Sequence, residues 1–249
     1  MQKVRWNTFG GVMTNPKLLC AIMTCFRLDY WIDDQTQDWL ASRGMRQTDQ
    51  QARVNTIRET WIKDLKSFDI PYKFFYGKRL RSSNERRVNP ALNKLRDPLP
   101  DEEFLDCGDN YTQNPAKMKA ICRYALDHGY DYILRCDDDT FVYPDRLLKE
   151  DWATKDYSGA NASEFHPGGC MFLSARLMRL IVDAPITTYA DDIWIGQIAQ
   201  DNRIPVTQIS SMYNHFGDAY KVPISIDPTG LSSLHSCTPS VMRRLYEQR

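Results

Sequence analysis

Residues 114–142 read NPAKMKAICRYALDHGYDYILRCDDDTFV, and this stretch predicts a helix followed by a buried strand. The helix is indicated by Asn114–Pro115 at its start, by apolar residues at helical spacing, and by Gly129 at its end. The strand is indicated over residues 130–136, and it ends at three consecutive aspartates, Asp137–Asp139. A helix that leads directly into a buried strand is typical of an α/β protein.

The same alternation extends in both directions along the chain. Further strands are predicted over residues 18–26 and 72–76, and further helices over residues 53–66, 174–184 and from residue 191. Strands that alternate with helices indicate a sheet covered by helices on both faces. Ligands of such sheets bind at the carboxyl ends of the strands, which is where Asp137–Asp139 are expected.

The composition fits one large folded domain or two small ones. Of 249 residues, 42% are hydrophobic and 26% are charged, which excludes a disordered or low-complexity chain. Lysine plus arginine and aspartate plus glutamate both total 32, so a globally basic nucleic-acid-binding protein is disfavoured. No apolar run approaches the roughly 20 residues of a membrane-spanning helix, so no membrane partner is expected.

The N-terminus and the cysteines favour a cytoplasmic protein. No signal peptide is recognised, so a chain that starts naturally at Met1 is expected in the cytoplasm, or in the host cytoplasm for a viral protein. The alternative is the lumenal catalytic domain of a longer chain. The seven cysteines form no CxxC pair, and reduced, buried thiols are predicted rather than a disulfide framework or a zinc site. The oligomeric state is left open.

Two segments stand apart from the alternation of strands and helices. Residues 27–52 are polar and irregular, and they are predicted to be a loop insertion. Residues 73–96, the basic segment, carry eight lysines and arginines against Glu85 alone. The basic segment is either a solvated loop or a surface that meets an anionic partner.

The three aspartates at the end of the 130–136 strand suggest a metal site. Alternate side chains of an extended segment point the same way, so Asp137 and Asp139 can share one divalent cation that relieves their repulsion. Carboxylate oxygens suit Mg²⁺ or Mn²⁺. The alternative is an exposed acidic loop that binds no metal ion.

Three other features have both a structural and a functional interpretation. Asp191–Asp192 open a predicted helix, where they either complement the helix dipole or supply a general base. His235 is either a structural residue or a ligand. Gly168–Gly169 form either a tight turn or a place where the backbone approaches a ligand closely.

Several segments, taken in chain order, resemble the motifs of one enzyme family. They are Ala21–Thr24 with Arg53–Trp61, Asp109–Lys117, Leu134–Val142, Gly168–Ser174, Asp191–Gly196, and Leu234–His235 followed by Met242 and Leu245. Over about residues 18–245 the chain resembles the fringe, core-1 and β-1,3-galactosyltransferase group, glycosyltransferase family thirty-one.

This resemblance implies one GT-A-type, Rossmann-like α/β domain with a mixed, mostly parallel sheet and helices on both faces. Residues 18–150 would form the nucleotide-sugar-binding half, and residues 151–249 the acceptor and catalytic half. The implied reaction moves a hexose from a UDP-hexose to an acceptor hydroxyl, with inversion at the anomeric carbon. The implied cofactor is Mn²⁺, or Mg²⁺.

The resemblance also assigns roles to individual residues. Asp137, Asp139 and His235 would bind the metal ion. Asp192 would be the general base, with Asp191 beside it as the second catalytic candidate. The residues assigned to the nucleotide sugar are Thr24, Arg53, Lys117, Asp137 and Asp138. Those assigned to the substrate are Gly168, Gly169 and Trp194.

The resemblance leaves the acceptor open. A glycan hydroxyl is the family default, whereas the basic segment leaves room for a hydroxylated base in DNA, of the kind that some phages carry. Two other classes are a catalytically inactive nucleotide-sugar-binding module and a metal-dependent nucleotidyltransferase or hydrolase. The combination of Asp139, Asp192 and His235 favours the transferase.

Overall fold

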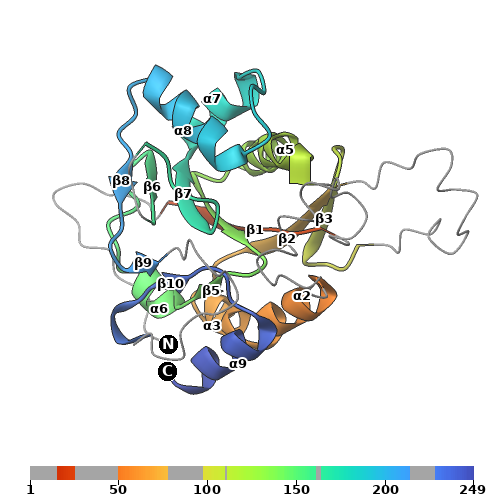
Figure 1. Cartoon of the computed structure of the whole chain (residues 1–249), viewed down its shortest axis with the longest axis vertical. Coiled ribbons are helices and arrows are strands. Elements are labelled where there is room, and N and C mark those ends of the chain that lie inside the picture. The colour runs from red at the N-terminus through yellow and green to blue at the C-terminus, as the bar shows by residue number, and fades with distance from the viewer. Residues whose placement is uncertain (1–15, 26–49, 78–97, 110, 161–163, 214–227) are drawn as a thin grey trace, which may run out of the picture.

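The structure is a computed structural model, and it describes residues 16–25, 50–77, 98–109, 111–160, 164–213 and 228–249 (Figure 1). Most of the predicted insertion and of the basic segment therefore lies outside the described residues. Residues 50–52 form the first turn of a helix, so the prediction of a loop up to residue 52 is wrong at its end. Two glutamines and an alanine at these positions are good helix formers.

A seven-stranded sheet runs through the molecule. In spatial order its strands are β3 (Glu102–Leu105), β2 (Tyr72–Gly77), β1 (Leu18–Met23), β4 (Tyr132–Asp137), β7 (Cys170–Ser174), β6 (Tyr157–Gly159) and β8 (Thr207–Gln208). Strands β3 to β4 are parallel, β7 is antiparallel to both of its neighbours, and β8 is parallel to β6. This mixed, mostly parallel sheet confirms the predicted fold class.

Helices cover both faces of the sheet, as predicted (Figure 1). One face carries α5 (Asn114–Asp127), α7 (Ala175–Asp183) and α8 (Asp191–Asp201). The other face carries α2 (Gln50–Glu59), α3 (Trp61–Ser67) and α9 (Pro239–Glu247).

A second, small sheet lies on the α9 side. Its strands, in spatial order, are β5 (Phe141–Val142), β10 (Ser233–Leu234) and β9 (Met212–Tyr213). The short helix α6 (Pro144–Leu147) follows β5, and short 3₁₀ turns cover Tyr111–Gln113 and Pro228–Gly230. The small sheet matters for function because it brings the C-terminal part of the chain to the end of β4.

The alternation of side chains along β1 explains why this sheet has two cores. Leu18, Cys20 and Ile22 pack on the face that α2, α3 and α9 cover. Leu19 and Ala21 point to the opposite face and pack against the side of α5, α7 and α8. Successive side chains of a strand point to opposite faces, so a strand buried on both sides is apolar throughout.

The structure corrects two details of the predicted helices. The helix predicted over residues 53–66 is two helices, α2 and α3, separated at Thr60. The Thr60 hydroxyl donates to the Thr56 carbonyl at 2.6 Å, a side-chain bond that competes with the helix backbone. Asn114 is not the N-cap of α5, because the helix begins there, after a 3₁₀ turn.

Trp61→Ala is expected to destabilise the fold strongly. The Trp61 side chain is fully buried, and its indole Nε1 donates to the Thr140 carbonyl at 3.1 Å, just after the aspartates. Removing a buried tryptophan typically costs about 3–5 kcal/mol of unfolding free energy. Chemical denaturation measures the loss, and Lys63→Ala, an exposed change on the same helix, should leave stability nearly unchanged. A Trp61→Ala loss as small as that of Lys63→Ala would contradict the packing described.

All seven cysteines are free thiols in the structure, and five of them are buried. Burial raises the pKa of the Cys122 thiol above its usual range, so this thiol stays protonated. Among the residues that the structure describes, no helix combines the length and the apolar character needed to cross a membrane.

Candidate active site

The carboxyl end of β4 brings the predicted metal ligands together. Asp137 is the last residue of β4, and Asp138 and Asp139 follow it. β10 pairs with β5, the strand directly after the aspartates, and the Cys237 N–H donates to the Asp139 carbonyl at 2.7 Å. These backbone contacts carry His235, which follows β10, to the aspartates.

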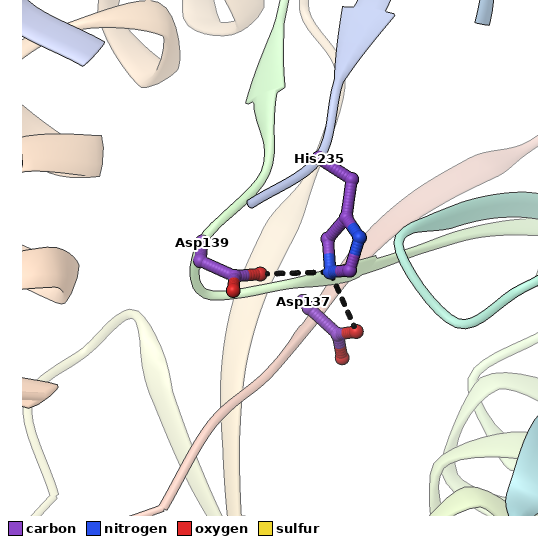
Figure 2. A group of neighbouring side chains, drawn as sticks. All are labelled: Asp137, Asp139 and His235. Carbon is purple, nitrogen blue, oxygen red and sulfur yellow. Dashed lines mark ion pairs between the residues drawn. The ribbon is translucent and has the colours of Figure 1, made fainter. Parts of the chain in front are cut away.

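His235 faces two of the three aspartates (Figure 2). Its Nε2 atom lies 3.1 Å from Oδ1 of Asp139 and 3.6 Å from Oδ2 of Asp137. One ligand atom from each of the three residues lies within 4.8 Å of the others. The structure therefore brings together all three residues that the sequence assigned to a metal ion; we call them the metal cluster.

The metal cluster fits a divalent cation. Oδ1 of Asp139 is buried and accepts no hydrogen bond from the described residues, although the His235 nitrogen lies close by. A buried carboxylate oxygen in this position is a ready ligand, since a cation would satisfy it. Two carboxylates and one imidazole suit a divalent metal ion that accepts both oxygen and nitrogen ligands.

The charges of the metal cluster depend on one another. Burial alone would raise the pKa of Asp139, but the charges of His235 and Arg53 hold it below its usual range. Burial raises the pKa of Asp137 to about 7, although the charges of Arg135 and His235 oppose the shift. Burial would lower the pKa of His235, but the two aspartates raise it above its usual value. The aspartates therefore draw positive charge to this point.

Asp138 faces away from the metal cluster and joins two neighbouring elements. Its Oδ2 accepts from the Thr24 hydroxyl at 2.6 Å, and its Oδ1 accepts from Arg53 Nη1 at 3.1 Å. Arg53 Nη1 also lies 3.8 Å from Oδ2 of Asp139. Burial raises the pKa of Asp138, against the charge of Arg53 and the bond from Thr24. Three residues assigned to the nucleotide sugar thus form one buried network.

Lys117 anchors the end of β1. Its ammonium donates to the Thr24 carbonyl and to Oδ1 of Asp109, each at 2.7 Å, and its side chain is buried. The same Asp109 oxygen accepts from the Gly77 N–H at 2.6 Å, at the end of β2. Lys117 and Asp109 therefore fix the carboxyl ends of β1 and β2, the edge where a nucleotide is expected.

Arg135 is a buried charge that the sequence analysis did not single out. Its Nη2 lies 3.0 Å from Oδ1 of Asp137 and 2.8 Å from Oδ2 of Asp191, the first residue of α8. Burial alone would lower the pKa of Arg135, but the charges of Asp137 and Asp191 raise it. Asp191 is therefore more than a partner of the helix dipole, because it neutralises a buried guanidinium. The signal in the sequence is one arginine inside an otherwise apolar strand.

Asp192 is the more exposed carboxylate of the pair that begins α8. It accepts a hydrogen bond from its neighbour Ile193 N–H at 2.8 Å. Burial, and then the charge of Asp191, raises the pKa of Asp192. A Cβ placed on Gly168 would lie 3.3 Å from Oδ2 of Asp137, so the backbone at this glycine passes close to the metal cluster.

Gly169→Ala is expected to weaken metal binding. A Cβ at position 169 would lie 2.5–2.8 Å from atoms of His235, so the imidazole would have to move. Disturbing the support of a ligand typically costs about 10–100-fold in metal affinity. Calorimetric titration with Mn²⁺ measures the loss. Gly230→Ala is the matched control, because a Cβ there meets nothing within 4 Å; equal affinities for both variants would contradict the role given to His235.

The Trp194 side chain does not lie at the surface of the candidate site. Its side chain is 1% exposed, it packs in the core beneath α8, and its Nε1 donates to the Pro185 carbonyl at 2.8 Å. The apolar neighbours on the same helix, Ile195 and Ile198, mark this face as a core face. The structure thus places Trp194 in the core, where it fixes the loop that leads into α8.

The sequence of the chain is similar to galactosyltransferases over part of its length. Residues 52–171, just under half of the chain, match the family model described as Galactosyltransferase. The matched span includes Arg53, Asp137–Asp139 and Gly168–Gly169, whereas Asp192 and His235 follow it.

Two curated relatives share this likeness. The chain is 32% identical over 97 residues to the hydroxyproline O-galactosyltransferases GALT2 and GALT6 of Arabidopsis thaliana. The aligned part covers 38% of this chain and spans 14% of the length of those relatives. The narrower resemblance to fringe and core-1 enzymes stays a prediction.

Solved structures with a similar chain trace share little sequence with this chain. A protein assigned as a nucleotide-diphospho-sugar transferase of Desulfovibrio desulfuricans matches with a TM-score of 0.48 at 11% identity, covering 94% of this chain and 96% of that one. A glycosyltransferase involved in glycosylation of the major capsid of PBCV-1 matches with a TM-score of 0.43 at 13% identity, covering 92% and 99%.

Proposed function

We propose that this chain is a metal-dependent, inverting glycosyltransferase that moves a hexose from a UDP-hexose to an acceptor hydroxyl. The observation that carries the proposal is the grouping of Asp137, Asp139 and His235 at the end of β4, which Arg135 links to the start of α8, where Asp192 lies. The family match over residues 52–171 supports sugar transfer as the reaction class. A metal-binding acidic loop and a separate, partly exposed carboxylate are the two groups that such a transfer needs.

On the donor side, we assign binding of the nucleotide sugar to the half formed by residues 18–150. Asp137 and Asp139, with His235 from the other half, would hold the metal ion, which supplies positive charge to the diphosphate leaving group. Asp138 keeps Thr24 and Arg53 in place beside the metal cluster. Lys117 fixes the carbonyl of Thr24 at the end of β1.

On the acceptor side, we assign the general base to Asp192. Its carboxylate would take the proton of the acceptor hydroxyl as that oxygen attacks the anomeric carbon. Burial and the charge of Asp191 raise the pKa of Asp192 and so bring it closer to neutral pH. A general base is most effective when its pKa lies near the working pH. A single displacement from the face opposite the leaving group inverts the anomeric configuration.

For the acceptor we propose a hydroxyl of a glycan or of a modified protein side chain. The named activity of the Arabidopsis relatives is galactosyl transfer to hydroxyproline, which supports galactose as the first donor sugar to test. The DNA acceptor rests on the basic segment, whose residues 78–96 lie outside the described part of the chain.

The test combines the full chain with Mn²⁺, a panel of UDP-sugars and several acceptors, and measures UDP release together with product mass. The acceptors are oligosaccharides, hydroxyproline peptides and DNA with hydroxylated bases. We expect UDP release that needs both metal and a glycan or hydroxyproline acceptor. Release without acceptor would indicate a hydrolase, donor binding without release an inactive module, and transfer to DNA alone the nucleic-acid acceptor.

A further inference from the structure

We propose that Arg135 is a positioning residue, which holds the metal ligand Asp137 and the start of α8 at a fixed separation so that Asp192 meets the acceptor. The inference rests on the proposed function, because it explains how the base is held relative to the donor. The structure shows the bridge itself, from Asp137 through Arg135 to Asp191.

The location of Arg135 calls for an explanation. It lies in the middle of β4, beside Ala21 of β1 and Met171 of β7, on the face that α5, α7 and α8 cover. Its side chain is 1% exposed. Placing a charge between apolar neighbours in a central strand costs stability, and a hydrophobic residue of similar volume often serves stability as well or better.

The guanidinium contacts each part of the site that has to be aligned. Its Nη2 joins Asp137 of the metal cluster and Asp191 at the start of α8. Its Nη1 fills the space beside Gly168, where a Cβ would lie only 2.9 Å away. The strand end, the glycine turn and the first turn of α8 therefore meet at one side chain.

This arrangement links two groups with different tasks. The sugar donor is held at the metal cluster on β4 and β10, whereas the base is the second residue of α8. A general base has to lie within hydrogen-bond reach of the proton that it takes. A misplacement of about 1 Å can cost about a hundredfold in rate. A fixed ion pair between the two elements keeps this distance constant.

Asp191→Asn tests the link, because it weakens the contact on the α8 side and leaves the contact between Arg135 and Asp137 in place. We expect turnover to fall at least about tenfold through misplacement of the base, while the donor KM and the Mn²⁺ affinity stay within about threefold. Unchanged turnover, or a loss confined to donor KM, would overturn the proposal.

A double-mutant cycle separates positioning from a general loss of structure. If Asp191 acts through Asp192, then Asp191→Asn should have little further effect on turnover in an Asp192→Asn background, since no base is left to misplace. An equal fold-loss in both backgrounds would show that Asp191 acts elsewhere, and it would overturn the proposal.

Arg135→Lys and Arg135→Met test the charge itself. Lysine keeps a positive charge between the two carboxylates, whereas methionine fills similar space without one. We expect the lysine variant to turn over at least about tenfold faster than the methionine variant, because it retains an attraction between β4 and α8. Equal turnover of the two folded variants would contradict a role for the charge.

Hydrogen exchange tests the link without any sugar transfer. The Trp194 N–H donates to the Ala190 carbonyl at 3.0 Å and closes the first turn of α8. Relative to amides of β1, this amide should exchange faster in Arg135→Met and in Asp191→Asn, but not in Asp192→Asn. Arg58→Met is the control, since Arg58 pairs with Asp101 and Glu102 on another part of the molecule. Faster exchange in these two variants, combined with a parent protein that transfers no sugar, would retain the link and reject the proposed function. Unchanged exchange in both variants would reject the link.

Discussion

Asp139→Ala is expected to abolish sugar transfer and metal-dependent binding of the nucleotide. Asp139 supplies the cluster's buried oxygen that accepts no hydrogen bond from the described residues, and it lies closest to His235. Removing this ligand leaves one carboxylate and one imidazole, which is too few to hold a divalent cation against solvent. We expect turnover below detection and a loss of Mn²⁺ affinity of at least about a hundredfold, toward the upper end of what disturbed metal sites show.

The control for this prediction is Asp145→Ala, which removes an exposed carboxylate on α6, a few residues further along the chain. It should leave turnover and metal affinity at the parent values. Circular dichroism and thermal unfolding establish that both variants are folded. An Asp139→Ala variant that transfers sugar in the presence of a chelator would show that the reaction does not depend on the metal cluster.

Asp192→Asn is expected to lose at least about a hundredfold in turnover, because a general base contributes about 10²–10⁴-fold. Asparagine keeps the size of the side chain and an oxygen that can accept from the Ile193 N–H, but it cannot take a proton. In the proposed function, donor binding rests on the metal cluster and not on this residue. We therefore expect Mn²⁺ and UDP-sugar affinities close to those of the parent protein.

Asp191→Asn is the matched comparison, since it changes the neighbouring carboxylate in the same way. Its expected loss, about tenfold, is smaller because it displaces a base instead of removing one. Turnover and donor affinity, measured side by side for both variants, show which substitution costs more activity. If Asp191→Asn is the less active variant, the base is assigned to the wrong residue of the pair; if both are fully active, α8 carries no base.

The residues near the strand ends could be predicted from the sequence because their signals are local. The β4 strand, the aspartates after it and the start of α8 are each marked within a few neighbouring residues. The pairing of Asp137 and Asp139 around one site follows from the alternation of an extended segment. His235 was added by the resemblance to known motifs, and β10 carries it to the aspartates.

The remaining features depend on partners that are distant in the sequence. Arg135 was missed because its partner Asp191 lies 56 residues further along the chain. Trp194 was assigned to the substrate because its motif lies at the site, whereas the apolar face of α8 places it in the core. Helical spacing does not reveal the break at Thr60, because Ile57 before it and Trp61 and Leu65 after it pack in the same core.

The central claim is that one displacement takes place between the metal cluster and Asp192. The most direct measurement is an NMR determination of the linkage that the parent protein makes from UDP-galactose, whose sugar is α-linked, in the presence of Mn²⁺ and an acceptor. We expect a β-linked product, because attack opposite the leaving group inverts the anomeric carbon. An α-linked product, or none with any UDP-hexose and acceptor class tested, would contradict this account.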